Sequence, residues 1–186
     1  MKFVRRFSRT ERTLHWVNAA GFLLLLATGL ILYLPRLSTV VGRRPLIKDI
    51  HLWGGIGWIS ALLIVIVLGD RGGLLRTARD LEVLKPSRLN VGQKINALLN
   101  AAFAVLFLVS GLLLWFGERD TRFRFTSTVL LHDILMYSAL TLLVGHLYLA
   151  LIHPATRHSL RGITRGTVRE DWAERHYPRW APPPAD

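Results

Sequence analysis

The chain has 186 residues, of which 51% are hydrophobic, and a mean hydropathy of +0.34. This length suits one domain, and this composition is too apolar for an ordinary soluble protein. The sequence contains no cysteine, which excludes disulfides, thiolate-bound iron–sulfur clusters and covalent haem attachment through a C-x-x-C-H motif. A formal net charge of +12 would suggest nucleic-acid binding in a soluble protein, so the distribution of the basic residues matters.

Four apolar runs in the sequence indicate membrane-spanning helices. Each run has about the 20 residues that a helix needs to cross a bilayer. We expect helices at about residues 9–34, 47–69, 93–116 and 126–153. The first run is too long for the apolar core of a secretory signal and no cleavage site of small residues follows it, so we expect it to remain in the membrane. The sequence therefore predicts an all-α integral membrane protein, with a four-helix transmembrane bundle in residues 1–156.

The basic residues are divided unevenly between the two sides of such a bundle. Of the 24 Lys and Arg residues, 17 fall before the first helix, around the second loop and in the tail, and seven fall in the first and third loops. Because basic residues accumulate on the cytoplasmic side, both termini are expected in the cytoplasm. This topology explains the net charge without a nucleic-acid partner. Residues 157–186 are basic and contain tryptophan, and we expect them to form a cytoplasmic tail at the membrane interface.

The first expected helix begins with a polar turn. Ser8 and Glu11 have the Ser-x-x-Glu spacing of a capping box, in which each side chain bonds the backbone N–H of the other residue. His15 follows one turn later, just inside the cytoplasmic surface of the membrane. Because polar side chains are costly inside a membrane and usually mark a site, His15 is a candidate ligand.

The second expected helix carries His51 in its first turns, near the outer surface of the membrane. Glycines follow it at positions 54, 55 and 57. Their small size either leaves room beside the helix for a flat macrocycle or allows another helix to pack closely, and the sequence leaves both interpretations open. The third expected helix contains no histidine and is not expected to supply a ligand. Its interior polar candidates are Asn96, Asn100 and Ser110.

The fourth expected helix contains two histidines, His132 and His146, which are fourteen residues apart. Fourteen residues make nearly four helical turns, so the two imidazoles share one face and lie about 21 Å apart. Since a bilayer core is about 30 Å thick, His132 is expected near the outer surface and His146 toward the inner one. His153 also shares this face and is an alternative inner ligand, although it lies at the membrane edge.

This topology pairs four histidines at two depths. His15 and His146 lie toward the cytoplasmic side, and His51 and His132 lie toward the outer side. A single membrane histidine is usually explained by a hydrogen bond between helices, but four at two matched depths favour haem, whose iron accepts two axial imidazoles. Structural zinc is disfavoured because it requires four close ligands. The sequence therefore predicts two b-type haems.

Six segments form a set in a fixed order: RTLHW around His15, IHLWGG around His51, LNVGQK before the third helix, LLHDI and GHLYLA around His132 and His146, and RGITRGTVREDWAERHYPRW in the tail. Together they resemble the cytochrome b (gamma) subunit of membrane-bound respiratory formate dehydrogenases. The resemblance implies the same two ligand pairs as the topology. It also implies that Asn90, Gly92 and Gln93 form part of a pocket for menaquinone or ubiquinone. Helix capping is the alternative role for Asn90.

The resemblance implies a protein of the bacterial inner membrane that passes electrons from a partner iron–sulfur subunit to quinone. The iron–sulfur subunit would receive them from a catalytic subunit containing molybdenum or tungsten. The loops are more compact than in longer family members and Asp133 follows the outer histidine of the fourth helix, and these departures leave the partner open. The alternatives are a standalone cytochrome b561-like protein oxidising superoxide or quinol, and the cytochrome b subunit of a hydrogenase or thiosulfate reductase. A proton or metal transporter is the alternative from a different class.

Overall fold

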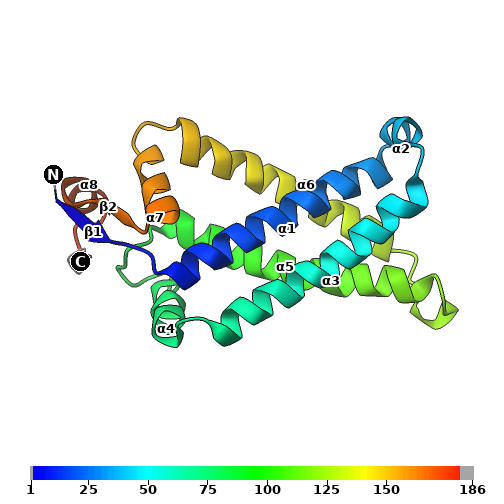
Figure 1. Ribbon diagram of the computed structural model, residues 1–186, viewed down its shortest axis with the longest axis horizontal. Helices are drawn as coiled ribbons and strands as arrows, with labels where there is room; N and C mark the ends of the chain where they lie inside the picture. Colours follow the sequence, from blue (N-terminus) through cyan, green and yellow to red (C-terminus); the bar gives the residue numbers. More distant parts are fainter. Residues whose placement is uncertain (1, 181–186) are drawn as a thin grey trace. The chain divides into compact units, whose positions relative to one another are not determined.

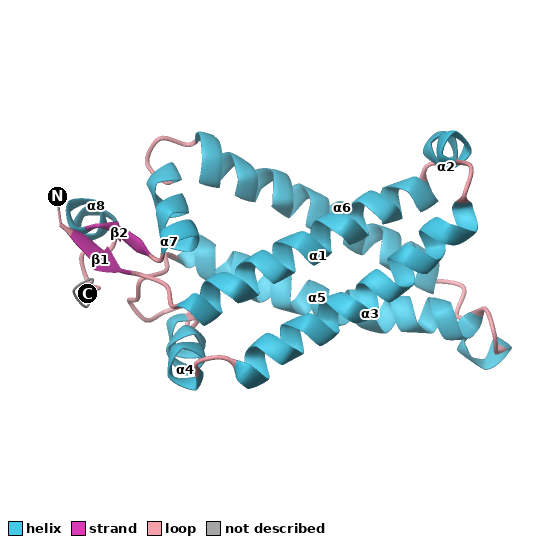
Figure 2. Cartoon of the chain, in the orientation of Figure 1, coloured by secondary structure: helices cyan, strands magenta, loops and turns pink. Residues whose placement is uncertain are grey.

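The computed structural model describes residues 2–180, and most of them are helical (Figure 2). The long helices are α1 (Arg9–Tyr33), α3 (Arg44–Leu68), α5 (Val91–Gly117) and α6 (Thr128–Leu147), the last of which continues into the π-helical turn η2 (Tyr148–Ile152). The four spans have 25 to 27 residues and are long and apolar enough to cross a membrane. The all-α membrane bundle predicted from hydropathy is thus confirmed (Figure 1).

Three short helical segments connect the spans. They are α2 (Pro35–Val41), α4 (Arg71–Asp80) and the 3₁₀ turn η1 (Thr121–Phe123). The Asp70 carboxylate caps α4 by accepting hydrogen bonds from the backbone N–H groups of Gly72 and Gly73, at 3.0 and 2.9 Å. α2 ends at Gly42, whose φ of +67° is in the left-handed region that glycine adopts without strain.

The segment after the fourth span folds against the N-terminal residues. It contains η3 (Arg157–Ser159), α7 (Leu160–Arg165), β2 (Thr167–Arg169) and α8 (Glu170–His176). β2 pairs in antiparallel fashion with β1 (Phe3–Arg5), with Val4 opposite Val168 (Figure 1). These two valines form a buried cluster with side chains of α8 and Tyr177. Residues 181–186 of the expected tail lie outside the described residues.

The chain divides into two compact units, and every long helix contributes to both. The terminal unit comprises Met1–His15, Val65–Ala101 and Thr141–Asp186, and the central unit comprises Trp16–Ile64 and Ala102–Leu140. His15 and His146 therefore belong to the terminal unit, whereas His51 and His132 belong to the central unit.

Few residues of the spans are buried by protein. In the most apolar 18-residue stretch of each span, 6% of the residues are buried in α1, α3 and α5, and 17% are buried in the fourth span. The exposed apolar side chains suit a lipid environment. The buried positions are close-packed, since a Cβ atom at Gly21 would lie only 2.2 Å from Cδ1 of Trp58. Gly21 is therefore required for the approach of the Trp58 ring to α1.

Candidate functional site

The central unit brings together the rings of His51 from α3 and His132 from α6. Their ring centroids are 6.3 Å apart and the ring planes are inclined at 71°. Both rings are half-buried. The two histidines that the sequence predicts as the outer pair thus lie side by side.

Each of these imidazoles has a hydroxyl group on its Nδ1 atom. Thr28 Oγ1 of α1 lies 2.8 Å from Nδ1 of His51, and Ser110 Oγ of α5 lies 2.8 Å from Nδ1 of His132. Each hydroxyl also bonds the carbonyl oxygen four residues earlier in its own helix, at 2.8 and 2.7 Å. Because a hydroxyl has one proton, donation to the carbonyl leaves its lone pair to accept the Nδ1–H of the imidazole. That tautomer has a free lone pair on Nε2, the form that binds a metal.

The two hydroxyls belong to a short sequence repeat. ATGLIL at 27–32 in α1 and VSGLLL at 109–114 in α5 both place a hydroxyl residue before a glycine. A Cβ atom at Gly29 would lie 3.3 Å from Cε1 of His51, and one at Gly111 would lie 3.8 Å from Cε1 of His132. Thr28 was not among the residues predicted from the sequence, and Ser110 was predicted only as an interior polar residue. The repeated hydroxyl–glycine–leucine pattern is the signal that could have identified both.

The glycines after His51 have different surroundings. A Cβ atom at Gly54 would lie 3.2 Å from Cδ2 of Leu24, so this glycine allows close packing against α1. Within residues 2–180, a Cβ atom at Gly57 would have no neighbour closer than 4 Å. The next residue, Trp58, has a buried indole N–H for which these residues provide no hydrogen-bond partner. The helix-packing interpretation thus applies to Gly54, whereas open space lies beside Gly57.

The terminal unit brings together His15 from α1 and His146 from α6. Their ring centroids are 6.2 Å apart and the ring planes are inclined at 52°. His153, the alternative ligand, ends the π-helical turn η2, where its Nδ1 lies 3.2 Å from Thr156 Oγ1 and its ring packs near Tyr148. The structure therefore places His146 beside His15 and gives His153 local partners.

The ring spacing in both pairs fits two imidazoles that share one metal ion. With a metal–nitrogen bond of about 2.0 Å and a ring nitrogen about 1.1 Å from its centroid, two imidazoles on opposite sides of an ion have centroids about 6.2 Å apart. The observed values are 6.2 and 6.3 Å. Within residues 2–180, no three His, Cys, Asp or Glu side chains group to hold an ion. Two imidazoles are what haem iron takes, because the macrocycle supplies the other ligands.

A charged network lies in the terminal unit near His15. Ser8 and Glu11 form the expected capping box, with hydrogen bonds of 2.7 and 3.3 Å. Glu11, one helical turn before His15, also accepts a hydrogen bond from Arg88 at 2.5 Å, and Arg88 bonds Asp80 at 2.6 Å. Burial acts to lower the pKa of Arg88, but its hydrogen bonds to Glu11 and Asp80 outweigh burial and raise that pKa overall.

Arg6 joins the two ends of the chain to this network. Its side chain is only 2% exposed, and its Nη2 donates to Tyr177 Oη at 2.7 Å, to Gln93 Oε1 at 3.1 Å and to the Arg88 carbonyl at 3.0 Å. The guanidinium also lies over the rings of Tyr177 and Trp172. Burial lowers the pKa of Arg6, and the contact with Tyr177 opposes this shift.

Asn90 and Gln93 form a capping box at the start of α5. Gln93 N donates to Asn90 Oδ1 at 2.9 Å, and Asn90 N donates to Gln93 Oε1 at 3.2 Å. A Cβ atom at Gly92 would make an ordinary contact with Asn90, at 3.5 Å. The capping role weighed for Asn90 is thus present. A role of Asn90, Gly92 and Gln93 in a quinone pocket stays a prediction.

Known proteins match this chain over most of its length. A family described as prokaryotic cytochrome b561 matches residues 6–166. The formate dehydrogenase cytochrome b556(fdo) subunit of Escherichia coli (strain K12) is 26% identical, over 94% of this chain and 90% of that protein. The formate dehydrogenase cytochrome b556 subunit of Haemophilus influenzae is 27% identical, over 94% of this chain and 81% of that protein. The nitrate-inducible cytochrome b556(Fdn) subunit of Escherichia coli (strain K12) is 24% identical, over 96% and 90%. The resemblance seen in the motifs is confirmed.

Proposed function

Because the chain belongs to the prokaryotic cytochrome b561 family, we propose that it is the two-haem membrane subunit of a formate dehydrogenase-type complex. The chain passes electrons from a partner iron–sulfur subunit to menaquinone or ubiquinone. The iron–sulfur subunit receives them from a catalytic subunit containing molybdenum or tungsten. Family membership supports haem b as the cofactor, and the names of the three relatives support this kind of complex.

The observation that carries the proposal is the occurrence of two histidine pairs with ring centroids 6.2 and 6.3 Å apart. His15 and His146 hold one haem b, and His51 and His132 hold the other. Bound haem b supplies a one-electron iron couple within the membrane. Two such couples in one chain suit electron transfer across a bilayer.

The residues around the central pair orient its ligands. Thr28 and Ser110 accept the Nδ1–H groups of His51 and His132, and in the neutral imidazoles this leaves the Nε2 lone pairs free to bind iron. The hydroxyls also resist rotation of the rings, because each hydroxyl is fixed to its own helix backbone. The side chains of His51 and His132 are thus held in one orientation before haem binds.

The distribution of basic residues supports a cytoplasmic location for both termini and the terminal unit. In that orientation, quinone is reduced near the His15–His146 pair, with protons taken from the cytoplasm. Asn90, Gly92 and Gln93 lie in the same unit and contribute to the quinone pocket. Electrons enter at the His51–His132 pair from a partner on the outer side of the bacterial inner membrane.

Haem quantification on the purified protein tests the cofactor content. We expect two haem b per chain by extraction and pyridine haemochromogen absorbance, and one haem after substitution of any one of the four paired histidines by leucine. The control H153L is expected to keep both haems. A protein that shows no b-type absorbance on dithionite reduction would refute the proposal.

Double variants test the pairing itself. H15L/H146L removes two ligands of one haem and should leave one haem, whereas H15L/H132L removes one ligand of each and should leave none. The reverse result would show that the pairs are wrongly assigned.

The partners are tested by mild-detergent purification from native membranes. Iron–sulfur and molybdenum- or tungsten-containing chains should co-purify, and formate should reduce the haems of that complex. A chain that purifies alone and is reduced by superoxide would instead be a standalone cytochrome.

A further inference from the structure

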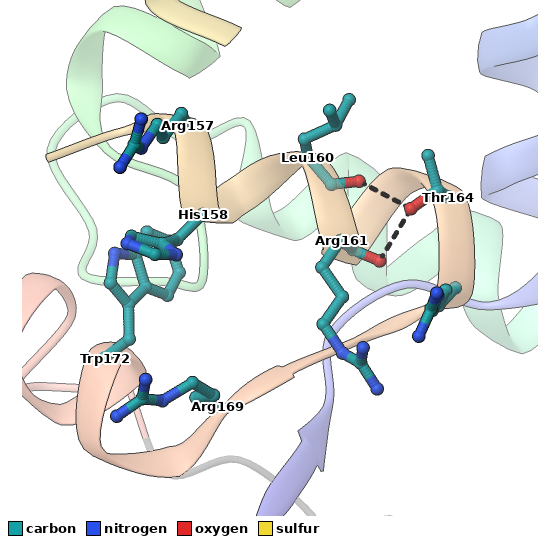
Figure 3. Close-up of a pocket in the computed structure, with 8 residues that line it drawn as sticks. Arg157, His158, Leu160, Arg161, Thr164, Arg169 and Trp172 are labelled. Atoms are coloured by element: carbon teal, nitrogen blue, oxygen red, sulfur yellow. Dashed lines mark hydrogen bonds between the residues drawn. The ribbon is translucent and has the colours of Figure 1, made fainter. Parts of the chain in front are cut away.

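A cavity of about 340 Å³ lies in the terminal unit, apart from both histidine pairs. Arg157 of η3 follows the last residue of the fourth span, Ile152, by five positions, so the cavity begins where the chain leaves the apolar span. The lining is mainly basic and includes Arg157, His158, Arg161, Arg165, Arg169 and Trp172 (Figure 3).

Carboxylates neutralise few of the positive charges on the basic side chains that line this cavity. In the part of the chain that the structure describes, no carboxylate lines the cavity. Arg169 is paired with Asp171 at 2.5 Å, but within residues 2–180 no ion pair is formed by Arg157, Arg161 or Arg165. The Nε atom of Arg161 is buried and has no hydrogen-bond partner among the described residues. Positive charge on this side of a bundle is ordinary, but topology alone does not require arginines to line one cavity or to bury a donor.

Hydrogen bonds and a ring contact hold other lining residues of the cavity in place. The Trp172 indole N–H donates to the Ala155 carbonyl at 3.2 Å, which fixes the ring as one wall. Thr164 Oγ1 bonds the Leu160 carbonyl at 2.9 Å, as Figure 3 shows. Arg161 lies over the Phe3 ring of β1, with 4.0 Å from its guanidinium carbon to the ring centroid. α7 is thereby held to β1.

We propose that this cavity binds the phosphate group of an anionic phospholipid in the leaflet next to the terminal unit. Guanidinium groups bind phosphate oxygens through paired, charge-assisted hydrogen bonds. Basic pockets at the ends of spans recognise lipid headgroups. The volume lies in the range of small-molecule sites, about 300 to 1,000 Å³, which favours a whole headgroup over a free phosphate ion.

Lipid retention by matched variants tests this site. The protein is reconstituted in nanodiscs of phosphatidylcholine with added phosphatidylglycerol, and retained phosphatidylglycerol is measured by native mass spectrometry after detergent release. R157Q/R161Q/R165Q removes three charges from the cavity. R71Q/R76Q/R79Q removes three charges from α4, which directly follows the span α3 and is exposed. The cavity variant should lose about tenfold or more in affinity, the change that one lost charge-assisted contact produces, and the α4 variant much less.

The outcomes separate a site from diffuse attraction. Equal losses in both triple variants, or no loss in the cavity variant, would overturn the proposal. Inorganic phosphate added as a competitor should displace phosphatidylglycerol poorly, and displacement at equal concentration would overturn the assignment to lipid. If the cavity triple variant does not fold, as judged by haem absorbance, R161Q and R161K replace it. R161Q should lose affinity, and R161K, which keeps the charge but not the paired donors, should lose less; no loss in R161Q would equally overturn the proposal.

Discussion

The two histidine pairs have nearly the same ring spacing but different surroundings. In the central unit, the neutral hydroxyls of Thr28 and Ser110 hold His51 and His132. In the terminal unit, His15 lies one turn from Glu11, which belongs to a charged network. One spacing of paired imidazoles is thus built in two ways. Neutral hydroxyls contact the rings of one pair, whereas a charged network connects the helix of the other pair to the loops and chain ends.

The largest effect is expected when the charged network is broken. In R88M the buried Glu11 carboxylate loses its cationic partner, which costs about 3–5 kcal/mol of unfolding free energy. Thermal and denaturant unfolding in detergent measure this loss. The exposed control R79M should change stability little.

The same variant tests whether the two histidine pairs depend differently on the charged network. In the proposed pairing, H132L leaves only the haem of His15 and His146, and R88M added to H132L should reduce haem content. In the same pairing, H146L leaves only the other haem, and R88M added to H146L should reduce haem content less. Equal reduction in both backgrounds would contradict the difference between the surroundings.

The next largest effect is expected from packing in the central unit. G21A puts a methyl group where Trp58 already lies, and such overpacking costs about 1–3 kcal/mol. G57A adds the same group where no atom lies within 4 Å and serves as the control. The melting temperature of G21A should fall below that of G57A. A melting temperature of G21A equal to or above that of G57A would show that the Trp58 contact is not required.

Smaller effects are expected from removal of the hydroxyls. T28V or S110A removes the acceptor on one Nδ1, at about 0.5–1.5 kcal/mol for one hydrogen bond. Redox titration and electron paramagnetic resonance should then show a changed potential and signal for one haem only. The control T39V alters an exposed threonine of α2. A shift in both haems, or in neither, would argue against the hydroxyls as positioning groups.

The smallest effect is expected from the exposed ion pair between Arg169 of β2 and Asp171 of α8. The hydrogen bond from Arg169 lowers the pKa of Asp171 below its ordinary value of 3.8. A depressed folded-state pKa gives stability that is present above the unfolded value and is lost as pH falls through the folded pKa. D171N should therefore have a slightly lower melting temperature than the unchanged protein above about pH 4, and this difference should disappear as pH falls further. Both haem spectra should be unchanged. Any effect at neutral pH on the haem spectra would refute this local role.

Hydropathy and histidine spacing predicted the spans and the candidate ligands because both signals are local in sequence. A span is readable from about 20 consecutive residues, and a shared helix face follows from helical periodicity. Thr28 was missed because a threonine in an apolar helix usually bonds its own backbone, and Thr28 makes that bond as well as the contact with His51. Its contact with His51 is a tertiary feature that no single segment contains.

The fold of the terminal unit was less predictable for the same reason. β1 and β2 have three residues each, too few to show an alternating pattern. Arg6 resembled one more solvated basic residue of a cytoplasmic segment, yet it is 2% exposed. Its burial depends on Tyr177, which lies 171 residues away in the sequence.

This separation sets an order of events during biosynthesis. Arg6 and Tyr177 are separated by all four spans, so their hydrogen bond can form only after the last span has been made. Arg6 can meet the Arg88 carbonyl and Gln93 earlier, because Arg88 precedes the third span and Gln93 lies at its start. The pairing of Val4 with Val168 must wait for the segment after the fourth span. The terminal sheet is therefore a late-forming part of the fold.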